Sequence, residues 1–253
     1  MSYTPGRFVW FEHLSNDIPK ARDFYEKLFG WNTEMMAMSS GDPYAMIHNG
    51  EAAIGGYAQA PAGSPPQWMS YLSVSDVDSA YKAALAAGAK SLAAPMDYGS
   101  AGRMATIADP TGGVFSLWHG AQGDPAETET TPPGGFIWDE LSTQDEKMAL
   151  AFYEKVFAFT NDAMPMAQGP YYVLKQGDKG RAGLYKAMDA AMPTMWTPYV
   201  CVADCDATSA KATSLGATVC VAPTDIPGVG RLALFNDPQG TSIAILKPNP
   251  SMT

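Results

Sequence analysis

The chain has 253 residues, enough for one large domain or two small ones, and 46% of them are hydrophobic against 17% charged. This composition excludes a disordered chain, which has few hydrophobic residues and many charges. The net charge of −10 argues against nucleic acid or an anionic membrane surface as a partner, because both are bound through basic patches. We therefore expect a globular protein that is a monomer or a homodimer.

The location of the protein is suggested by what its sequence lacks. No stretch approaches the roughly 20 consecutive apolar residues that a membrane helix needs, and the first residues lack the apolar core of a signal peptide. The three cysteines, Cys201, Cys205 and Cys220, are odd in number and too sparse for a disulfide framework. We expect a cytoplasmic protein without disulfides.

The first half of the chain predicts two helices set among short strands. Phe8–Leu14 alternates large apolar residues with others, as a strand does. Asp17 begins a helix that Gly30 ends, and Asp76 begins a second helix that Gly88 ends. Further strands are expected over Thr33–Met38, Tyr44–His48, Ala52–Gln59, Trp68–Val74, Lys90–Leu92, Arg103–Ala108 and Val114–His119.

The second half repeats the first at a fixed offset. Trp10 returns as Trp138, an offset of 138 − 10 = 128 residues. The same offset relates Phe24-Tyr25 to Phe152-Tyr153, Trp68 to Trp196, and Asp109-Pro110 to Asp237-Pro238. Residues 121–133 between the halves are turn-rich and have no hydrophobic periodicity, which is typical of a linker. The repeat predicts two domains, 5–120 and 134–248, each with two βαβββ units.

These units resemble the vicinal-oxygen-chelate superfamily, which includes glyoxalase I, extradiol dioxygenases, fosfomycin-resistance enzymes and bleomycin-resistance proteins. The resemblance rests on the Phe-Tyr near the end of each first helix, on Phe-Gly-Trp31, and on a last strand that follows Asp-Pro-x-Gly. It covers nearly the whole chain and is strongest with two-domain, glyoxalase-like proteins. It implies an α+β fold in which each domain is an eight-stranded mixed sheet curled into a cup with helices outside. In the family's enzymes the cup holds the ligand and a divalent metal.

The resemblance also assigns metal-ligand positions, which the family's enzymes fill with His, Gln or Glu. This chain has other residues there: Trp10, Met69 and Ser116 in the first half, and Trp138, Thr197 and Ala244 in the second. Indole offers a metal no lone pair, and Ser and Ala are not usual ligands. We therefore expect no metal at the family's usual place and predict no cofactor.

The leading candidates for ligand contact are a Trp-x-Glu pair at the start of each half. Side chains two apart on a strand share a face, so Glu12 follows Trp10 into the cup and Glu140 follows Trp138. The aromatic ring supplies apolar contact area, and the carboxylate could bind a cationic or hydroxyl-bearing ligand. Further candidates on the expected cup-lining strands are Tyr44, Met69, Tyr71, Ser116, Tyr172, Thr197 and Tyr199.

An architectural role for the same glutamates stays open. In that interpretation the tryptophans fill the core, and each glutamate pairs with an arginine, because a carboxylate is rarely buried unpaired. Arg103 and Arg231, which also repeat at the offset of 128, are the expected partners. The histidines do not repeat, and His13, which matches Leu141, should face the helix layer or solvent.

Three functions follow from these patterns. The first is a metal-free protein, similar to the bleomycin-resistance branch, that binds a small apolar or aromatic molecule. The second is a metal-dependent lyase, isomerase or dioxygenase with an unconventional site at Glu12, Glu140 or a histidine. The third is a partner-binding role with cups plugged by tryptophan. The sequence assigns no catalytic residue.

Overall fold

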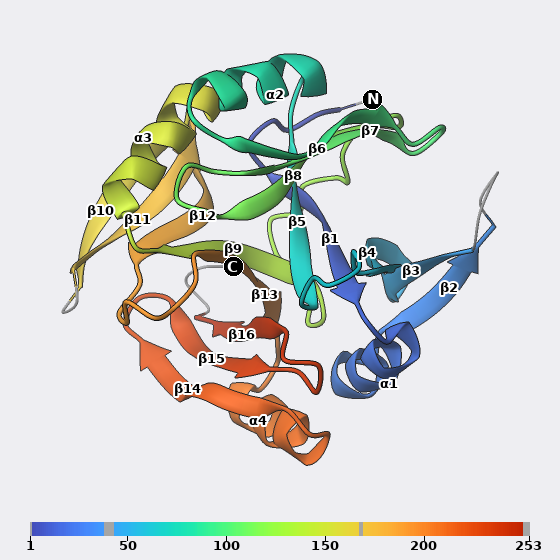
Figure 1. The fold of residues 1–253 in the computed structure, drawn as a ribbon. Helices are drawn as coiled ribbons and strands as arrows, with labels where there is room; N and C mark the ends of the chain where they lie inside the picture. The colour runs from blue at the N-terminus through green and yellow to red at the C-terminus, as the bar shows by residue number, and fades with distance from the viewer. Residues whose placement is uncertain (1, 38–42, 167–168, 250–253) are drawn as a thin grey trace. The chain divides into compact units, whose positions relative to one another are not determined.

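A computed structural model gives the fold, and it describes residues 2–37, 43–166 and 169–249. Within these residues the chain forms two eight-stranded mixed sheets and four α-helices in repeated βαβββ units (Figure 1). The predicted α+β class is confirmed. Met38, the last residue of one expected strand, lies outside the described residues.

The first half forms one sheet with the strand order β2-β3-β4-β1-β5-β8-β7-β6. β1 runs parallel to β4, and β5 runs parallel to β8. The elements are β1 (Phe8–Ser15), α1 (Ile18–Phe29), β2 (Asn32–Met36), β3 (Tyr44–Asn49), β4 (Ala52–Gln59), β5 (Gln67–Ser73), α2 (Val77–Ala86), β6 (Lys90–Asp97), β7 (Gly102–Ala108) and β8 (Val114–Gly120).

The second half forms the matching sheet, with the order β10-β11-β12-β9-β13-β16-β15-β14. Its parallel pairs are β9 with β12 and β13 with β16. The elements are β9 (Phe136–Thr143), α3 (Glu146–Phe157), β10 (Thr160–Met166), β11 (Gly169–Gln176), β12 (Lys179–Lys186), β13 (Met195–Cys201), α4 (Cys205–Ser214), β14 (Thr218–Ile226), β15 (Gly230–Asn236) and β16 (Ser242–Pro248).

The helices begin and end for the reasons that the sequence indicated. The Asp17 side chain accepts the backbone N–H of Lys20, and α1 ends at Gly30, whose φ of 74° is left-handed. In the second half Ala158 takes the same left-handed conformation, with a φ of 54°, at a cost of about 1 kcal/mol for a residue with a Cβ. β6 is longer than expected, because Pro95 is tolerated in a strand at the edge of a sheet.

The chain divides into two compact units, and each unit draws on both halves of the sequence. Unit 1 comprises Met1–Trp10, Met69–Ala126 and Trp138–Thr197, and in it α2 contacts α3. Unit 2 comprises Phe11–Trp68, Glu127–Ile137 and Pro198–Thr253, and in it α1 contacts α4. The sequential domains 5–120 and 134–248 therefore describe the repeat, and their independence as folding domains stays a prediction.

The segment between the halves is held by side chains of the first half. In unit 1 the Asp124 carboxylate accepts the Ser73 hydroxyl at 2.6 Å, and in unit 2 Asn49 donates to the Pro133 carbonyl at 3.0 Å. The helices in the described part of the chain all fall short of the length and apolarity that a membrane crossing demands.

Candidate functional site

The second-half Trp-x-Glu pair lies in unit 1, in a group of half-buried side chains that we call the Glu140 cluster: Trp138, Glu140, Tyr171 and Tyr185. The Trp138 indole N–H donates to the Tyr171 hydroxyl at 2.9 Å, and that hydroxyl donates to Glu140 Oε2 at 2.7 Å. The Tyr171 ring stacks on Tyr185, with 6.3 Å between ring centroids and 18° between the planes. The candidate carboxylate is therefore oriented by two aromatic residues.

Strand register explains how the cluster forms. β9 places Glu140 beside Gly183 of β12, and β11 places Tyr171 opposite Tyr185 of the same strand. A Cβ atom on residue 183 would collide with the Tyr171 hydroxyl, so only glycine lets that hydroxyl reach Glu140.

The electrostatics of the cluster keep both tyrosines protonated. Burial, followed by the charge of Glu140 and the hydrogen bond to it, raises the pKa of Tyr171 well above its usual value. Burial and the charge of Glu140 also raise the pKa of Tyr185 to about 12. At neutral pH each phenol can therefore act as a hydrogen-bond donor but not as a base.

The first half repeats part of this arrangement. In unit 2 the Tyr44 hydroxyl donates to Glu12 Oε1 at 2.9 Å, and a Cβ at Gly56 would collide with that hydroxyl. Ala58 stands where the second half has Tyr185, two residues beyond the glycine in each case. Trp10 lies two residues before Glu12 on β1 and belongs to unit 1.

The tyrosine that contacts Glu140 is Tyr171, a residue that the sequence analysis did not select. Tyr172, the residue that it did select, lies on the opposite face of β11, because neighbouring residues of a strand point to opposite sides. The offset of 128 that relates the tryptophans becomes 171 − 44 = 127 for the bonded tyrosines. Gly56 and Gly183 are also related by an offset of 127 rather than 128. Comparing these glycines together with the tyrosines could have revealed the one-residue change in offset.

The remaining candidates lie on central strands and are buried. Met69 and Tyr71 lie on β5, and Tyr71 is paired in register with Ser116 of β8. The Ser116 hydroxyl is 2.9 Å from the Thr106 hydroxyl. Thr197 and Tyr199 lie on β13.

The arginines expected to pair with the glutamates bind aspartates instead. Arg103 donates to both carboxylate oxygens of Asp78, at 2.7 and 2.9 Å, and pairs with Asp97 at 2.9 Å. Arg231 makes the equivalent contacts with Asp206 and Asp225. Glu12 and Glu140 each accept a hydrogen bond from a tyrosine hydroxyl, that of Tyr44 and that of Tyr171 respectively.

The residues at the family's metal-ligand positions do not fit a divalent metal. Ser116 is buried and bonded to Thr106, Ala244 is fully buried and offers no donor atom, and Met69 offers only a soft thioether. The described residues contain no group of three or more His, Cys, Asp or Glu that could hold a metal ion.

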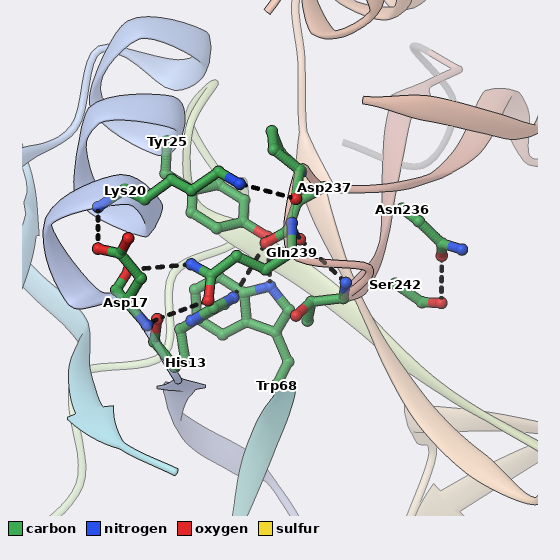
Figure 2. Close-up of polar contacts among 12 residues, drawn as sticks. His13, Asp17, Lys20, Tyr25, Trp68, Asn236, Asp237, Gln239 and Ser242 are labelled. Atoms are coloured by element: carbon green, nitrogen blue, oxygen red, sulfur yellow. Dashed lines mark hydrogen bonds and ion pairs between the residues drawn. The ribbon is translucent and has the colours of Figure 1, made fainter. Parts of the chain in front are cut away.

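A second polar network, which we call the Asp237 relay, joins the two halves of the sequence inside unit 2: Trp68, Tyr25, Asp237 and His13 (Figure 2). The Trp68 indole donates to the Tyr25 hydroxyl, which donates to Asp237 Oδ2, each at 3.0 Å. His13 Nε2 lies 3.0 Å from the same oxygen, and the His13 side chain is 0% exposed. His13 thus faces the helix layer, one of the two orientations expected.

Backbone groups complete the Asp237 relay. Asp237 Oδ1 accepts the N–H groups of Gln239 and Thr241, within the turn that carries the Asp-Pro-x-Gly pattern. Burial by itself raises the pKa of Asp237, but the hydrogen bond and charge of His13, with these N–H groups, outweigh burial and lower it. The carboxylate is therefore held ionised in the core.

Unit 1 contains the equivalent Asp109 relay: Trp196, Tyr153 and Asp109. The Trp196 indole donates to the Tyr153 hydroxyl at 3.0 Å, and that hydroxyl donates to Asp109 Oδ2 at 2.7 Å. The two relays explain why tryptophan, tyrosine and the Asp-Pro-x-Gly turn recur at the fixed offset, a role that the sequence analysis missed.

Comparisons with known proteins agree with this architecture. The profile of the Glyoxalase/Bleomycin resistance protein/Dioxygenase superfamily matches residues 7–117. The chain is 38% identical to "Putative glyoxylase CFP32" of Mycobacterium tuberculosis (strain CDC 1551 / Oshkosh), over 98% of this chain and 97% of that protein. It is 29% identical to "Anthracycline biosynthesis protein DnrV" of Streptomyces peucetius, over 97% of this chain and 94% of that protein.

A solved structure has the same fold at low sequence identity. The Mn(II)-bound glyoxalase from Novosphingobium aromaticivorans superposes with a TM-score of 0.65 at 15% identity, over 99% of this chain and 89% of that one. With the duplicated βαβββ units and the near-full-length relative at 38% identity, we conclude that the chain belongs to the glyoxalase/bleomycin resistance/dioxygenase superfamily, as its sequence resemblance implied.

Proposed function

We propose that this protein binds a small aromatic molecule through the half-buried Trp, Glu and Tyr side chains that each half carries, without the metal of the family's enzymes. The observation that carries the proposal is the Glu140 cluster, in which an oriented carboxylate lies beside three aromatic side chains. Aromatic rings provide contact area for a planar ligand, and a carboxylate fixes its orientation through a hydrogen-bond donor.

Two further observations support the proposal. The residues at the metal-ligand positions lack suitable donor atoms, so a catalytic metal has no ready set of ligands there. The relative from Streptomyces peucetius is named for anthracycline biosynthesis, and anthracyclines are planar, fused-ring aromatic compounds with hydroxyl groups. A cytoplasmic location is part of the proposal and is consistent with free thiols at Cys201, Cys205 and Cys220.

The test is a titration of the purified protein with a hydroxylated anthraquinone, before and after dialysis against a chelator. We expect the same binding in both samples, measured by calorimetry, and a higher melting temperature with ligand. The double variant Glu12→Gln, Glu140→Gln should lose binding while its melting temperature without ligand stays close to that of the unmodified protein. A large loss of stability with binding intact would instead assign the glutamates an architectural role.

The same experiment separates the proposal from a metal-dependent enzyme. If the chelator abolishes binding and added Mn²⁺, Fe²⁺, Zn²⁺ or Ni²⁺ restores it, the metal-dependent alternative is correct. If neither sample binds any aromatic compound in a broad thermal-shift screen, the proposed function is wrong.

A further inference from the structure

We propose that Asn49 is a site of spontaneous deamidation, and that its modification loosens residues 132–135 by removing a side chain that holds them. In the first step the Gly50 backbone nitrogen bonds to Asn49 Cγ, and the bond from Cγ to Nδ2 breaks. The proton of the Gly50 nitrogen passes through solvent to the leaving nitrogen, which departs as ammonia. Water then opens the cyclic imide at either carbonyl and leaves aspartate or isoaspartate at this position.

The first observation is the place of Asn49 in a tight hairpin. The chain has six asparagines, and Asn49 alone is followed by glycine. Asn49 ends β3 and pairs with Ala52 of β4, so Gly50 and Glu51 form a two-residue loop. Gly50 is exposed and has a left-handed φ of 62°. Because glycine has no Cβ, nothing on residue 50 shields its nitrogen from the neighbouring carboxamide.

The second observation is the contact between Asn49 and the segment that leads into β9. Asn49 Nδ2 donates to the Pro133 carbonyl at 3.0 Å, and both residues lie in unit 2. A Cβ on Gly134, whose φ is 87°, would lie only 2.6 Å from Asn49 Oδ1, so the carboxamide packs directly on that glycine. The Trp31 indole donates to the Gly134 carbonyl at 2.8 Å. Asn49 is therefore a side-chain anchor of residues 132–135, beside Trp31.

The second half of the chain has an equivalent hairpin that carries glutamine in place of asparagine. Gln176 corresponds to Asn49 at an offset of 176 − 49 = 127, and Gly177 follows it with a φ of 60°. A Cβ on Gly6 would lie 2.6 Å from Gln176 Cγ, and the Gln176 amide donates to the Phe157 carbonyl at 2.6 Å. The longer glutamine side chain has to close a larger ring, which forms much more slowly. The chain thus contains its own unreactive counterpart.

Deamidation turns the anchor into a repulsive contact. The asparagine carboxamide donates through its nitrogen, whereas a carboxylate at residue 49 only accepts, as the Pro133 carbonyl does. The hydrogen bond is lost and a negative charge is placed near a carbonyl oxygen. While Pro133 and Gly134 hold the carboxamide, it is not free to rotate toward the Gly50 nitrogen. We therefore expect the reaction to follow local opening of residues 132–135 and to make that opening permanent.

The first experiment ages the full-length protein in mildly alkaline buffer at physiological temperature. Chromatography and mass spectrometry of the peptide that contains residue 49 separate asparagine, aspartate and isoaspartate. We expect conversion at Asn49 to be much faster than at the other asparagines or at Gln176. Gly134→Ala should speed conversion about fivefold, because its Cβ displaces the carboxamide and one hydrogen bond no longer opposes opening. Gly6→Ala introduces equal backbone strain beside Gln176, at a φ of 86°, and should leave the rate at Asn49 unchanged.

The second experiment measures the consequence by hydrogen exchange. The Gly134 N–H donates to the Cys201 carbonyl at 2.8 Å, so its exchange rate reports opening of the segment. Asn49→Asp, which copies one product, should raise this rate about fivefold. The Gly6 N–H donates to the Ser73 carbonyl at 2.9 Å in unit 1, and its exchange should stay the same. Asn49→Gln copies the second half and should abolish the conversion.

Each part of the proposal has an outcome that overturns it. Conversion at Asn49 no faster than at the other asparagines would remove the site. If Gly134→Ala does not fold, a low concentration of urea should accelerate conversion in the unmodified protein, because urea favours local opening. A rate that neither Gly134→Ala nor urea changes would overturn the dependence on opening. Unchanged exchange at Gly134 in Asn49→Asp and in the aged protein would overturn the loosening of the segment.

Discussion

The Asp237 relay and the Asp109 relay share a Trp–Tyr–Asp chain, yet their surroundings differ at two positions of the neighbouring strand. Unit 2 has Phe11 and His13 on β1, where unit 1 has Asp139 and Leu141 on β9. Each unit thus buries one additional ionisable side chain on the same face of this strand. The two positions are not equivalent: His13 corresponds to Leu141, which lies two residues after Asp139. His13 is 0% exposed and Asp139 is 1% exposed.

The two additional groups have opposite electrostatic consequences. His13 is the hydrogen-bond partner of Asp237 and helps to lower the pKa of that carboxyl. For Asp139, burial raises the pKa to about 7, although the nearby Ser70 hydroxyl and the Glu140 N–H act in the other direction. One scaffold therefore supports a buried carboxylate that stays ionised in unit 2 and a carboxyl that holds its proton near neutrality in unit 1.

The largest expected effect comes from separating the halves. Tyr25 and Trp68 come from the first half and Asp237 from the second, so residues 1–126 expressed alone lack the acceptor that their relay needs. We expect this fragment to show no cooperative unfolding as a monomer, and co-expression with residues 127–253 to restore a single cooperative species. Circular dichroism during urea unfolding is the measurement. A stable, monomeric first half would show that the sequential domains fold independently.

The next effect is the loss of either central aspartate. Asp237→Ala leaves Tyr25, His13 and two backbone N–H groups without their acceptor and should lower the free energy of unfolding by about 3–5 kcal/mol. Asp109→Ala should cost less, because Leu141 stands where unit 2 has a histidine. Urea unfolding of both variants tests the order. Equal losses would mean that His13 adds nothing to the Asp237 relay.

Asp139 predicts a pH dependence near neutrality. Its folded pKa of about 7 lies above the unfolded value of roughly 3.9, so the folded chain binds an extra proton between these values and stability falls as pH rises from about 4 to about 7. At about 1.4 kcal/mol per pKa unit, the loss is of order 4 kcal/mol once ionisation is complete.

The variant Asp139→Asn should flatten the unfolding free energy between pH 4 and 7, measured by urea unfolding at several pH values, because asparagine does not titrate. The matched substitution Asp139→Phe copies the residue of unit 2 at the same position, Phe11, and should also remove the dependence. An unmodified protein that gains stability across this window would contradict the prediction.

The smallest expected effect lies at acidic pH. The folded pKa of Asp237 is lowered, so its contribution to stability is present above the unfolded pKa and is lost as pH falls through the folded one. His13→Leu, which copies Leu141, should raise the folded pKa and move the midpoint of acid unfolding to higher pH. Leu141→His serves as the reciprocal variant beside Asp109. An unchanged acid midpoint in His13→Leu would show that the N–H groups of Gln239 and Thr241 suffice to hold Asp237 ionised.

The sequence allowed the fold to be predicted because its repeat is carried by residues with strong local preferences. Asp17 and Gly30 mark helix ends, and the strands alternate in the expected way. The pairing of units could not be predicted in this way. His13 and Asp237 are 224 residues apart, and an internal repeat identifies equivalent residues but not which of them meet in space.

The candidate site could be predicted only in part for a related reason. Trp138 and Glu140 share a face of one strand, which strand periodicity alone gives. Their contact with Tyr171 depends on the register of two further strands and on a one-residue change in offset between the halves. Periodicity in a single strand carries no information about that register.

The composition of the compact units has a consequence for rearranging the gene. Unit 1 consists of residues 69–126 and 138–197, which only residues 127–137 interrupt, together with residues 1–10. Unit 2 consists of residues 11–68 and 198–253, which lie towards opposite ends of the sequence, together with residues 127–137. A circular permutant opened in the exposed loop around Gly63, with the old ends fused by a flexible peptide, would encode each unit almost without interruption. We expect such a chain to fold with more local contacts and therefore faster than the natural order.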